Sequence, residues 1–375
     1  MGRKGLHHRV VVCTALLTAA MAAHAVPPAA TVVVVEPGTL EVQKLLVAGD
    51  PNGTPPDSPA ARVDLNTTTS IFAGAGSVFA DLGSGSGYMG TGALVHGFTP
   101  GKEGVRNFVV TAAHVVDIDN NGSADFAPSA VSFILNAGSS FSQQIVAKSI
   151  TIHPDFTGFN NPVVNDDIAV IELTANAASG VPVYNLSTAS SGSAQVITSV
   201  GYGKSGDAIN GYTIGPSFSV KRVGKNQRDA VGLDDEGSGA SEVFYADFDG
   251  PNQSTNVFDI GSPGFSPSIE GTLGNDVETT LGPGDSGGPS FLSDWDTLQP
   301  LVGTDGNLTL LGINNFTGAA IATTPYFGSF YGGMYIPAYA AWIDSVIPEP
   351  TTLSLLALAG LAVLRRRKRP LATSQ

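Results

Sequence analysis

The sequence predicts an all-β protein, and three observations lead to this class. Short runs of apolar residues recur along the body of the chain, Gly, Asn and Asp separate them, and one segment alone has helical spacing. Short apolar strands with turn signals between them are typical of a β-sandwich or barrel. The expected strands are 31–35, 108–111, 131–135, 144–152, 168–173, 195–200 and 308–313. The expected helix is 337–347, where Ala338, Ala341, Trp342 and Val346 recur at helical spacing.

The first 25 residues have the three parts of a secretory signal peptide. Basic residues at 3, 4 and 9 precede the apolar run 10–23, and Ala23-His24-Ala25 is a cleavage site of the A-x-A type. We expect a signal peptidase to cut after Ala25. Cys13, the sole cysteine of the chain, lies inside this segment. The mature protein is therefore expected to hold no disulfide and no thiolate metal site.

The C-terminus combines Pro348-Glu349-Pro350, the apolar span 351–364 and the basic residues 365–369. The apolar span has 14 residues, which is about 21 Å of helix and falls short of the roughly 20 residues that cross a bilayer comfortably. Because such a basic cluster stays on the cytoplasmic side, the segment predicts a short, transient transmembrane helix with the globular part outside.

These three parts, in this order at the end of the chain, resemble the PEP-CTERM sorting signal of Gram-negative bacteria over residues 348–370. The resemblance implies recognition and removal by an exosortase-type enzyme, followed by release or attachment at the cell surface. An ordinary tail anchor is the alternative, since a short apolar helix followed by arginines would look similar.

The charge of the mature body excludes one class of partner. Without the two terminal signals, ten basic and 31 acidic residues remain, a net charge near −21. Such a surface stays soluble and repels nucleic acid. Because no basic stripe remains, we expect no nucleic-acid partner.

The body divides by composition into a leader and one large domain. Residues 26–69 are rich in Pro, Ala, Thr and Asp, which is typical of a leader, a linker or a propeptide. From about residue 70 to 347 the strand pattern described above takes over. Within this domain, residues 204–276 are polar and Gly-rich and carry the acidic run 234–236, so we expect long loops there.

Three short segments supply the parts of a nucleophilic site. His114 lies just after the apolar strand 108–111. Asp166 and Asp167 precede another expected strand, 168–173, and Ser286 lies in the turn GPGDSGGPS. A serine hydroxyl is a poor nucleophile without a base, and the base needs a carboxylate that sets its tautomer. The order His, Asp, Ser supplies the three parts, whereas each segment alone would be an ordinary turn or strand end.

The segments TAAH (111–114), DIAV (167–170) and GDSGGP (284–289) resemble the TAAH, DIAL and GDSGGP motifs of the trypsin/chymotrypsin family of serine proteases. Segments 150–156, 199–203, 311–316 and 332–343 are also similar to stretches of that family. The resemblance covers about residues 70–347. It implies two six-stranded antiparallel β-barrels with a C-terminal helix.

The resemblance also implies a role for each matched residue. His114 is the general base and Ser286 is the nucleophile. Asp167 orients the histidine. We choose Asp167 over Asp166 because Asp167 directly precedes the Ile-Ala of the motif. The backbone N–H groups of Gly284 and Ser286 match the oxyanion hole. A Cβ at position 284 would obstruct a turn that aims two amides at one point.

The chain departs from the family at two places. Val115 replaces the cysteine that follows the catalytic His, and no other disulfide is present. In animal members a new N-terminus pairs with the Asp before the nucleophile, which is Asp285 here. Residues from Ile71 onward could play this part after cleavage at Ser70–Ile71, or could simply form the first strand.

The family's substrate pocket maps onto five residues. Thr280 matches the base of the primary pocket, and the walls match Asn315, Phe316, Thr317 and Gly333. Because Thr280 is uncharged, we expect a neutral side chain, apolar or small, in the substrate. Glu278 is close in sequence and could alter this preference.

The segment 117–125 has the spacing D-x-D-x-N-G-x-x-D. Alternating oxygen ligands around a Gly turn suit Ca²⁺, so Asp117, Asp119, Asn121 and Asp125 are candidate ligands of a structural calcium. The acidic residue expected at the twelfth position is replaced by Pro128, and a solvated Asp/Asn turn is an equal alternative.

Taken as a whole, the sequence predicts an exported serine endopeptidase that acts on protein or peptide substrates and needs no cofactor for its chemistry. It would reside outside the cell or at the surface of a Gram-negative bacterium. A surface adhesion or scaffolding protein on a protease fold is the alternative, and loss of a triad member would have favoured it.

Overall fold

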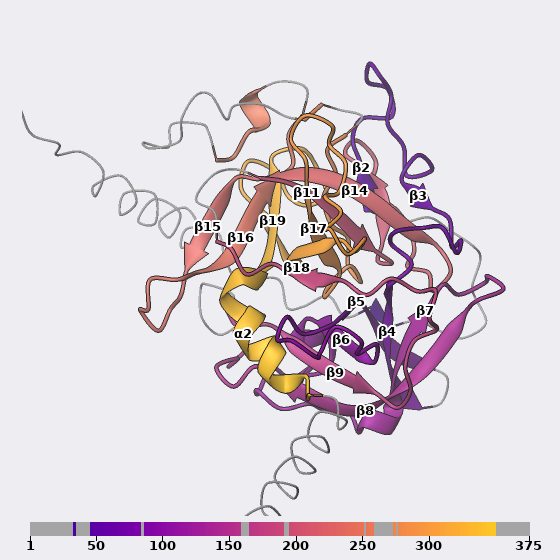
Figure 1. Cartoon of the computed structure of the whole chain (residues 1–375). Helices are drawn as coiled ribbons and strands as arrows, with labels where there is room; N and C mark the ends of the chain where they lie inside the picture. The colour runs from indigo at the N-terminus through magenta and orange to yellow at the C-terminus, as the bar shows by residue number, and fades with distance from the viewer. Residues whose placement is uncertain are drawn as a thin grey trace, which may run out of the picture.

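The computed structural model describes residues 33–34, 46–83, 86–158, 165–190, 195–250, 253–258, 273–274 and 277–349. Figure 1 shows two β-barrels, one above the other, with a helix running along their side. The strand that the sequence predicts at 31–35 is β1 (Val33–Val34), which pairs with the edge of the first barrel at Met89 and Tyr88. The predicted signal peptide and C-terminal apolar span lie outside the described residues.

The first barrel is a closed antiparallel sheet of six strands. Its order is β5-β4-β7-β8-β9-β6, and β6 returns to pair with β5. The strands are β4 (Ala75–Gly83), β5 (Ser86–Val95), β6 (Phe108–Thr111), β7 (Val131–Leu135), β8 (Gln143–Ile152) and β9 (Ala169–Leu173). Alternate side chains, Val109, Phe133 and Ile171 among them, fill the interior as one apolar cluster.

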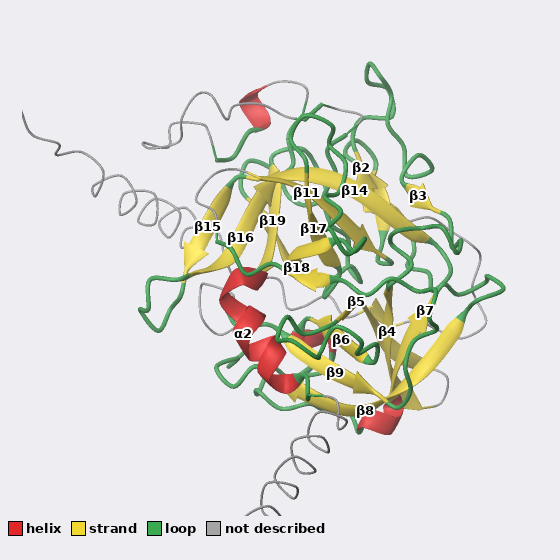
Figure 2. Ribbon diagram, viewed as in Figure 1, coloured by secondary structure: helices red, strands yellow, loops and turns green. Residues whose placement is uncertain are grey.

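The second barrel is built from the sheet order β14-β11-β17-β18-β19-β16. Its two end strands face each other, because Asp229 N donates to Tyr245 O at 2.9 Å and Asn226 Nδ2 donates to Asp247 O at 2.5 Å. The strands are β11 (Gln195–Gly201), β14 (Lys221–Arg228), β16 (Ser241–Asp247), β17 (Pro289–Ser293), β18 (Thr309–Ala319) and β19 (Ser329–Tyr335). The predicted all-β class, with a C-terminal helix, is confirmed (Figure 2).

Further short strands and 3-10 turns lie outside the two six-stranded barrels. They are β2 (Leu46–Ala48), β3 (Val63–Asp64), β10 (Asn185–Leu186), β12 (Ser205–Asp207), β13 (Gly211–Ile214), β15 (Ala230–Leu233) and the 3-10 turns η1 (Ala113–Val115), η2 (Pro128–Ala130) and η3 (Gln253–Thr255). The expectation of long loops over 204–276 is wrong for its described residues, because β12 to β16 lie in this range. The polar sequence of β14 concealed a strand whose Lys221, Arg222 and Arg228 are buried.

Helix α2 (Ile336–Val346) follows β19 directly and packs between the barrels. Ile336, Tyr339, Ala340 and Ile343 are its buried apolar face, with the spacing of an amphipathic helix. Of the residues noted for their helical spacing, Ala338, Trp342 and Val346 are partly buried against this core, and Ala341 is exposed. The Asp344 carboxylate pairs with Lys102 Nζ at 3.1 Å, which joins the helix to the first barrel.

Residues 46–70 lie against the second barrel rather than apart from it. β2 pairs in parallel with β12, and β3 pairs antiparallel with β14. In Figure 1 both strands lie beside β14, at the top of the molecule.

Candidate active site

His114 and Asp167 come from neighbouring strands of the first barrel. Thr111 at the end of β6 pairs with Ala169 at the start of β9, so the residues just beyond them meet at one edge. His114 Nδ1 lies 2.6 Å from Asp167 Oδ2, and the His114 backbone N–H donates to Asp167 Oδ1 at 2.9 Å. Asp167 is fully buried and His114 is 4% exposed. The carboxylate therefore fixes both the ring and the backbone of the histidine.

Asn315 of β18 brings the second barrel to the same carboxylate. Its Nδ2 donates to Asp167 Oδ2 at 2.7 Å and to the Asp167 carbonyl at 2.5 Å. Its Oδ1 accepts the N–H of Met334 at 3.0 Å, which fixes the amide orientation. The sequence placed Asn315 in a pocket wall, whereas its side chain points to Asp167.

Ser286 lies in a tight turn just before β17, in which two glycines have positive φ. Gly284 has φ 101° and Gly287 has φ 79°, values that favour glycine. The turn is held by Asp285 N donating to Gly282 O at 2.9 Å and by Gly288 N donating to Asp285 O at 2.8 Å. Among the described residues, no acceptor bonds the N–H of Gly284 or of Ser286. Both amides thus remain available to an incoming oxygen.

Thr91 of β5 ties this turn to the first barrel. Its N–H donates to Ser286 O at 2.8 Å and its hydroxyl donates to Gly284 O at 2.9 Å. Gly287 lies so close to Thr111 and Ala112 that a Cβ would clash with both. Ser286 is therefore held next to the strand end that carries His114. Sequence reasoning missed Thr91 because it lies in an unremarkable strand and reveals its role through partners far away in the chain.

Asp285 points away from solvent and is bonded by the protein itself. Its Oδ1 accepts Gly203 N at 2.8 Å and its Oδ2 accepts Gly282 N at 2.9 Å. Burial raises the pKa of Asp285 to about 6, against these amide bonds and the charge of Arg222, which lower it. Ile71, the residue that could begin a new N-terminus, is 43% exposed.

The remaining pocket candidates lie on three segments of the second half of the chain: the stretch before the nucleophile turn, β18 and β19. Thr280 is fully buried and forms an antiparallel bridge with Val47. Phe316 packs edge-to-face against Tyr245, with ring centroids 5.8 Å apart, and Thr317 is half-buried beside it on β18. Gly333 of β19 pairs with Asn314 of β18 and with Phe244 of β16.

The loop 117–125 gathers three of its four predicted calcium ligands. One carboxylate oxygen from each of Asp117, Asp119 and Asp125 lies within 4.8 Å of the others. Asp117 accepts the N–H of Asn121 at 3.1 Å and of Gly122 at 2.7 Å, and burial raises its pKa. The side-chain oxygen of Asn121 accepts the N–H of Ser123 at 2.9 Å. The donor set fits a hard cation.

Asp166, the alternative to Asp167, faces another group of residues. Its Oδ1 lies 3.2 Å from His153 Nδ1, and its backbone N–H donates to the Tyr339 hydroxyl at 3.2 Å. Its carboxylate also lies within 4.8 Å of oxygens from Asp235, Glu236 and Glu242. Burial, then repulsion from Asp166 and the carboxylates at 234–236, raises the pKa of Glu242 to about 8.

Comparison with known protein families bears on two regions of the chain. The trypsin family model matches residues 78–263, a range that includes His114 and Asp167 and ends before Ser286. The PEP-CTERM protein-sorting motif matches residues 346–369. No curated protein is significantly similar to this chain.

The matched sorting motif indicates export and sorting to the cell surface. No helix in the described part of the chain, which ends at Glu349, is long and apolar enough to span a membrane. The family match, the closed first barrel and the meeting of the three motif segments at one edge agree with one another. The chain therefore carries a trypsin-family domain, matched over residues 78–263, and a C-terminal PEP-CTERM sorting motif.

Proposed function

We propose that this chain is an active, exported serine endopeptidase in which His114, Asp167 and Ser286 act as the catalytic triad. The observation that carries the proposal is the buried Asp167 carboxylate, which binds His114 Nδ1 at 2.6 Å and is itself bonded by Asn315. A carboxylate in this position leaves Nε2 as the basic nitrogen of a neutral His114 and stabilises the imidazolium that forms when it takes a proton.

In the acylation step, Ser286 Oγ would attack the carbonyl carbon of the scissile peptide while its proton passes to His114 Nε2. The carbonyl oxygen becomes an oxyanion, and the N–H groups of Gly284 and Ser286 would stabilise it. The imidazolium then gives its proton to the leaving amine. The C–N bond breaks, the new amine departs, and an ester to Ser286 remains.

In the deacylation step, His114 would take a proton from water, whose oxygen attacks the ester. The same two amides stabilise the second oxyanion. The proton returns to Ser286 Oγ as the C–O bond breaks, which releases the carboxylic acid and restores the enzyme. Each proton transferred in these two steps passes through His114, so the proposed chemistry uses no metal or organic cofactor.

The proposed substrate is a protein or peptide with a neutral side chain before the scissile bond. Thr280 is uncharged and fully buried, and Glu278 is also buried with both carboxylate oxygens bonded, to Leu273 N at 2.8 Å and Asp249 N at 2.9 Å. Burial raises the pKa of Glu278 well above its ordinary value, which favours its uncharged form. Neither residue offers a free carboxylate to a basic substrate.

The proposal also includes removal of the two terminal signals as the protein is sorted to the cell surface. A signal peptidase would remove residues 1–25, and an exosortase-type enzyme would act at Pro348-Glu349-Pro350. Protein recovered from the native cell surface or medium is then expected to end near 348–350, as measured by mass spectrometry. Chains that reach Gln375 and occur in the membrane fraction alone would make this an ordinary membrane-anchored protease.

The triad is tested by covalent labelling. The mature protein should react with a fluorophosphonate probe, and Ser286→Ala should not. Ser290→Ala is the matched control, because Ser290 is a buried serine four residues away that bonds Asn314 Oδ1 at 2.7 Å. Equal labelling of wild type and Ser286→Ala would refute the assignment. An unlabelled wild type, folded by circular dichroism, would favour the scaffolding alternative.

A further inference from the structure

A short strand from the N-terminal segment packs against the second barrel beside Thr280, the candidate base of the substrate pocket. All three residues of β2 (Leu46–Ala48) are 0% exposed. Val47 N donates to Thr280 O at 3.2 Å, and Thr280 N donates to Val47 O at 3.3 Å. β2 thus provides a pairing strand for the segment that corresponds to the pocket base.

A second set of contacts locks β2 in place. It pairs with β12 from Ser205 to Asp207, and the Ser205 hydroxyl donates to the Leu46 carbonyl. Ala208 N donates to Ala48 O at 3.0 Å. The Leu46 side chain belongs to an apolar cluster that includes Leu281, the residue after Thr280. Backbone pairing and side-chain packing therefore both connect β2 to the pocket segment.

The chain after β2 continues along the same barrel. Asp57 accepts Gly49 N at 2.7 Å and pairs with Arg62 at 2.5 Å, which closes the loop between β2 and β3. Arg222 Nε donates to the Pro59 carbonyl at 3.0 Å. The loop between β2 and β3 therefore also contacts β14, the strand that carries Arg222.

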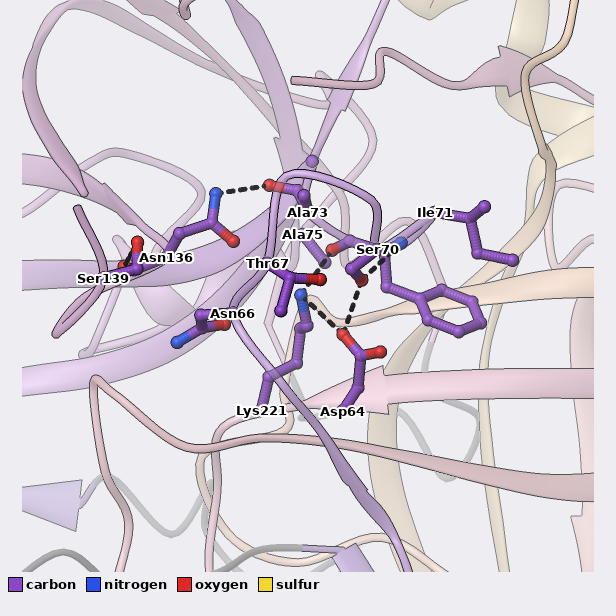
Figure 3. A network of polar contacts seen from close by, with 12 residues as sticks. Asp64, Asn66, Thr67, Ser70, Ile71, Ala73, Ala75, Asn136, Ser139 and Lys221 are labelled. Carbon is purple, nitrogen blue, oxygen red and sulfur yellow. Dashed lines mark hydrogen bonds and ion pairs between the residues drawn. The ribbon is translucent and has the colours of Figure 1, made fainter. Parts of the chain in front are cut away.

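The end of the segment is anchored by an ion pair. Lys221 is 0% exposed, and its Nζ lies 2.9 Å from Asp64 Oδ2 and donates to Phe72 O at 3.0 Å. Ser70 Oγ donates to Asp64 Oδ2 at 2.6 Å. Figure 3 shows Asp64 between Lys221 and Ser70, with Ile71 beyond. A charge as buried as Lys221 is costly without its partner, so the fold depends on Asp64 staying in place.

We propose that residues 46–70, which we name the N-terminal arm, are a permanent part of the active enzyme, in which Val47 positions Thr280 at the base of the substrate pocket. This inference rests on the proposed function, since the pocket matters to a peptidase. The arm is a positioning element, because its backbone bonds the pocket segment at Thr280. The family match begins at residue 78 and leaves the arm unassigned.

The alternative is that the arm is a propeptide, removed by cleavage between Ser70 and Ile71. Its removal would expose the apolar residues that Leu46 covers and would leave the buried Lys221 without Asp64. A newly formed N-terminus would also meet an Asp285 whose two oxygens already accept backbone N–H groups. Both considerations favour retention of the arm.

The first test identifies the N-terminus of the active species. Protein from the native host is labelled with a fluorophosphonate, denatured and measured by intact mass and N-terminal peptide sequencing. The labelled chain is expected to begin before Leu46. A labelled chain that begins at Ile71 would overturn the proposal. Absence of label would instead count against the proposed function, so the two failures are distinguishable.

The second test perturbs the contact. Val47→Pro removes the N–H that bonds Thr280 O, and the Michaelis constant for a peptide amide should rise about tenfold, equivalent to about 1.4 kcal/mol. The rate of fluorophosphonate labelling, which reports Ser286 itself, should change less than about threefold. A Michaelis constant equal to that of wild type would overturn the proposal.

A milder variant covers the case in which Val47→Pro does not fold. Ser205→Ala removes the hydroxyl bond to Leu46 O and leaves the backbone intact. It should raise the Michaelis constant in the same direction, by about threefold, as expected for the loss of a hydrogen bond at the weak end of the usual range. Ser217→Ala is the matched control, because Ser217 is equally buried and its hydroxyl contacts Ser219 rather than the arm. Equal values for the two variants would overturn the proposal.

Discussion

Replacing Asn315 with leucine tests whether the second barrel supports catalysis through Asp167. Leucine has nearly the same shape as asparagine but donates no hydrogen bond. The change removes the bonds from Nδ2 to Asp167 Oδ2 at 2.7 Å and to Asp167 O at 2.5 Å. A hydrogen bond to a charged group contributes about 1.5–3 kcal/mol, which corresponds to a loss of about 10- to 150-fold in kcat/KM.

The assay is hydrolysis of a peptide amide, with the concentration of active sites titrated by a fluorophosphonate so that unfolded protein is not counted. Asn314→Leu is the control, since Asn314 is 0% exposed on the same strand and bonds Ser290 at 2.7 Å rather than Asp167. Both variants lose a buried polar contact, so a general loss of stability would lower them alike. A kcat/KM for Asn315→Leu within twofold of the control would refute the reasoning.

Two further predictions concern carboxylate groups, one set in the loop 117–125 of the first barrel and one on β16 of the second. Millimolar Ca²⁺ should raise the unfolding temperature relative to EDTA, because a ligand at a hundred times its Kd stabilises the native state by about 2.7 kcal/mol. The shift should disappear in Asp119→Ala and persist in the control Glu242→Gln. A shift that persists in Asp119→Ala would place the ion elsewhere. The raised pKa of Glu242, about 8 against an ordinary 4.5, means that the folded state holds its proton more tightly, so its contribution to stability should fall as pH rises from about 4.5 to about 8 and level off above. Glu242→Gln should therefore gain stability over wild type at pH 9 and lose the gain at pH 4.5, as measured by urea unfolding, and an equal difference at both pH values would contradict this account.

Strand positions in the first barrel could be predicted closely because local pattern and final environment agree. Segments 108–111 and 131–135 have apolar residues that the barrel buries, and both match the observed strands without a shift. In β14 the local signal is misleading, since Lys221, Arg222 and Arg228 would normally lie in solvent. Their burial depends on partners such as Asp64 and the Pro59 carbonyl, which no local pattern identifies.

The residues of the candidate site also divide into those that local sequence identifies and those that depend on distant partners. His114, Asp167 and Ser286 each carry a motif that local sequence displays. Asn315 was assigned to a pocket wall from its resemblance to the family, but the direction of its side chain, toward Asp167 of the first barrel, depends on how the two barrels pack. Thr91 has no motif at all. The arm residues at 46–48 were assigned to a leader on composition, although their apolar run pairs with a segment late in the chain.

The placement of the site between two barrels has a consequence for its stability. His114 and Asp167 belong to the first barrel, whereas Ser286 and Asn315 belong to the second. The barrels are joined at the site by the bonds from Thr91 to the nucleophile turn and from Asn315 to Asp167, and at a distance by the Lys102–Asp344 pair. Further contacts, such as the Tyr202 hydroxyl donating to Ala75 O at 3.1 Å, and the apolar cluster around α2 also hold the two halves together, and no disulfide adds to them. Loss of either barrel's packing would therefore separate the base from the nucleophile before the chain unfolds completely, so activity should disappear at a lower denaturant concentration than secondary structure does.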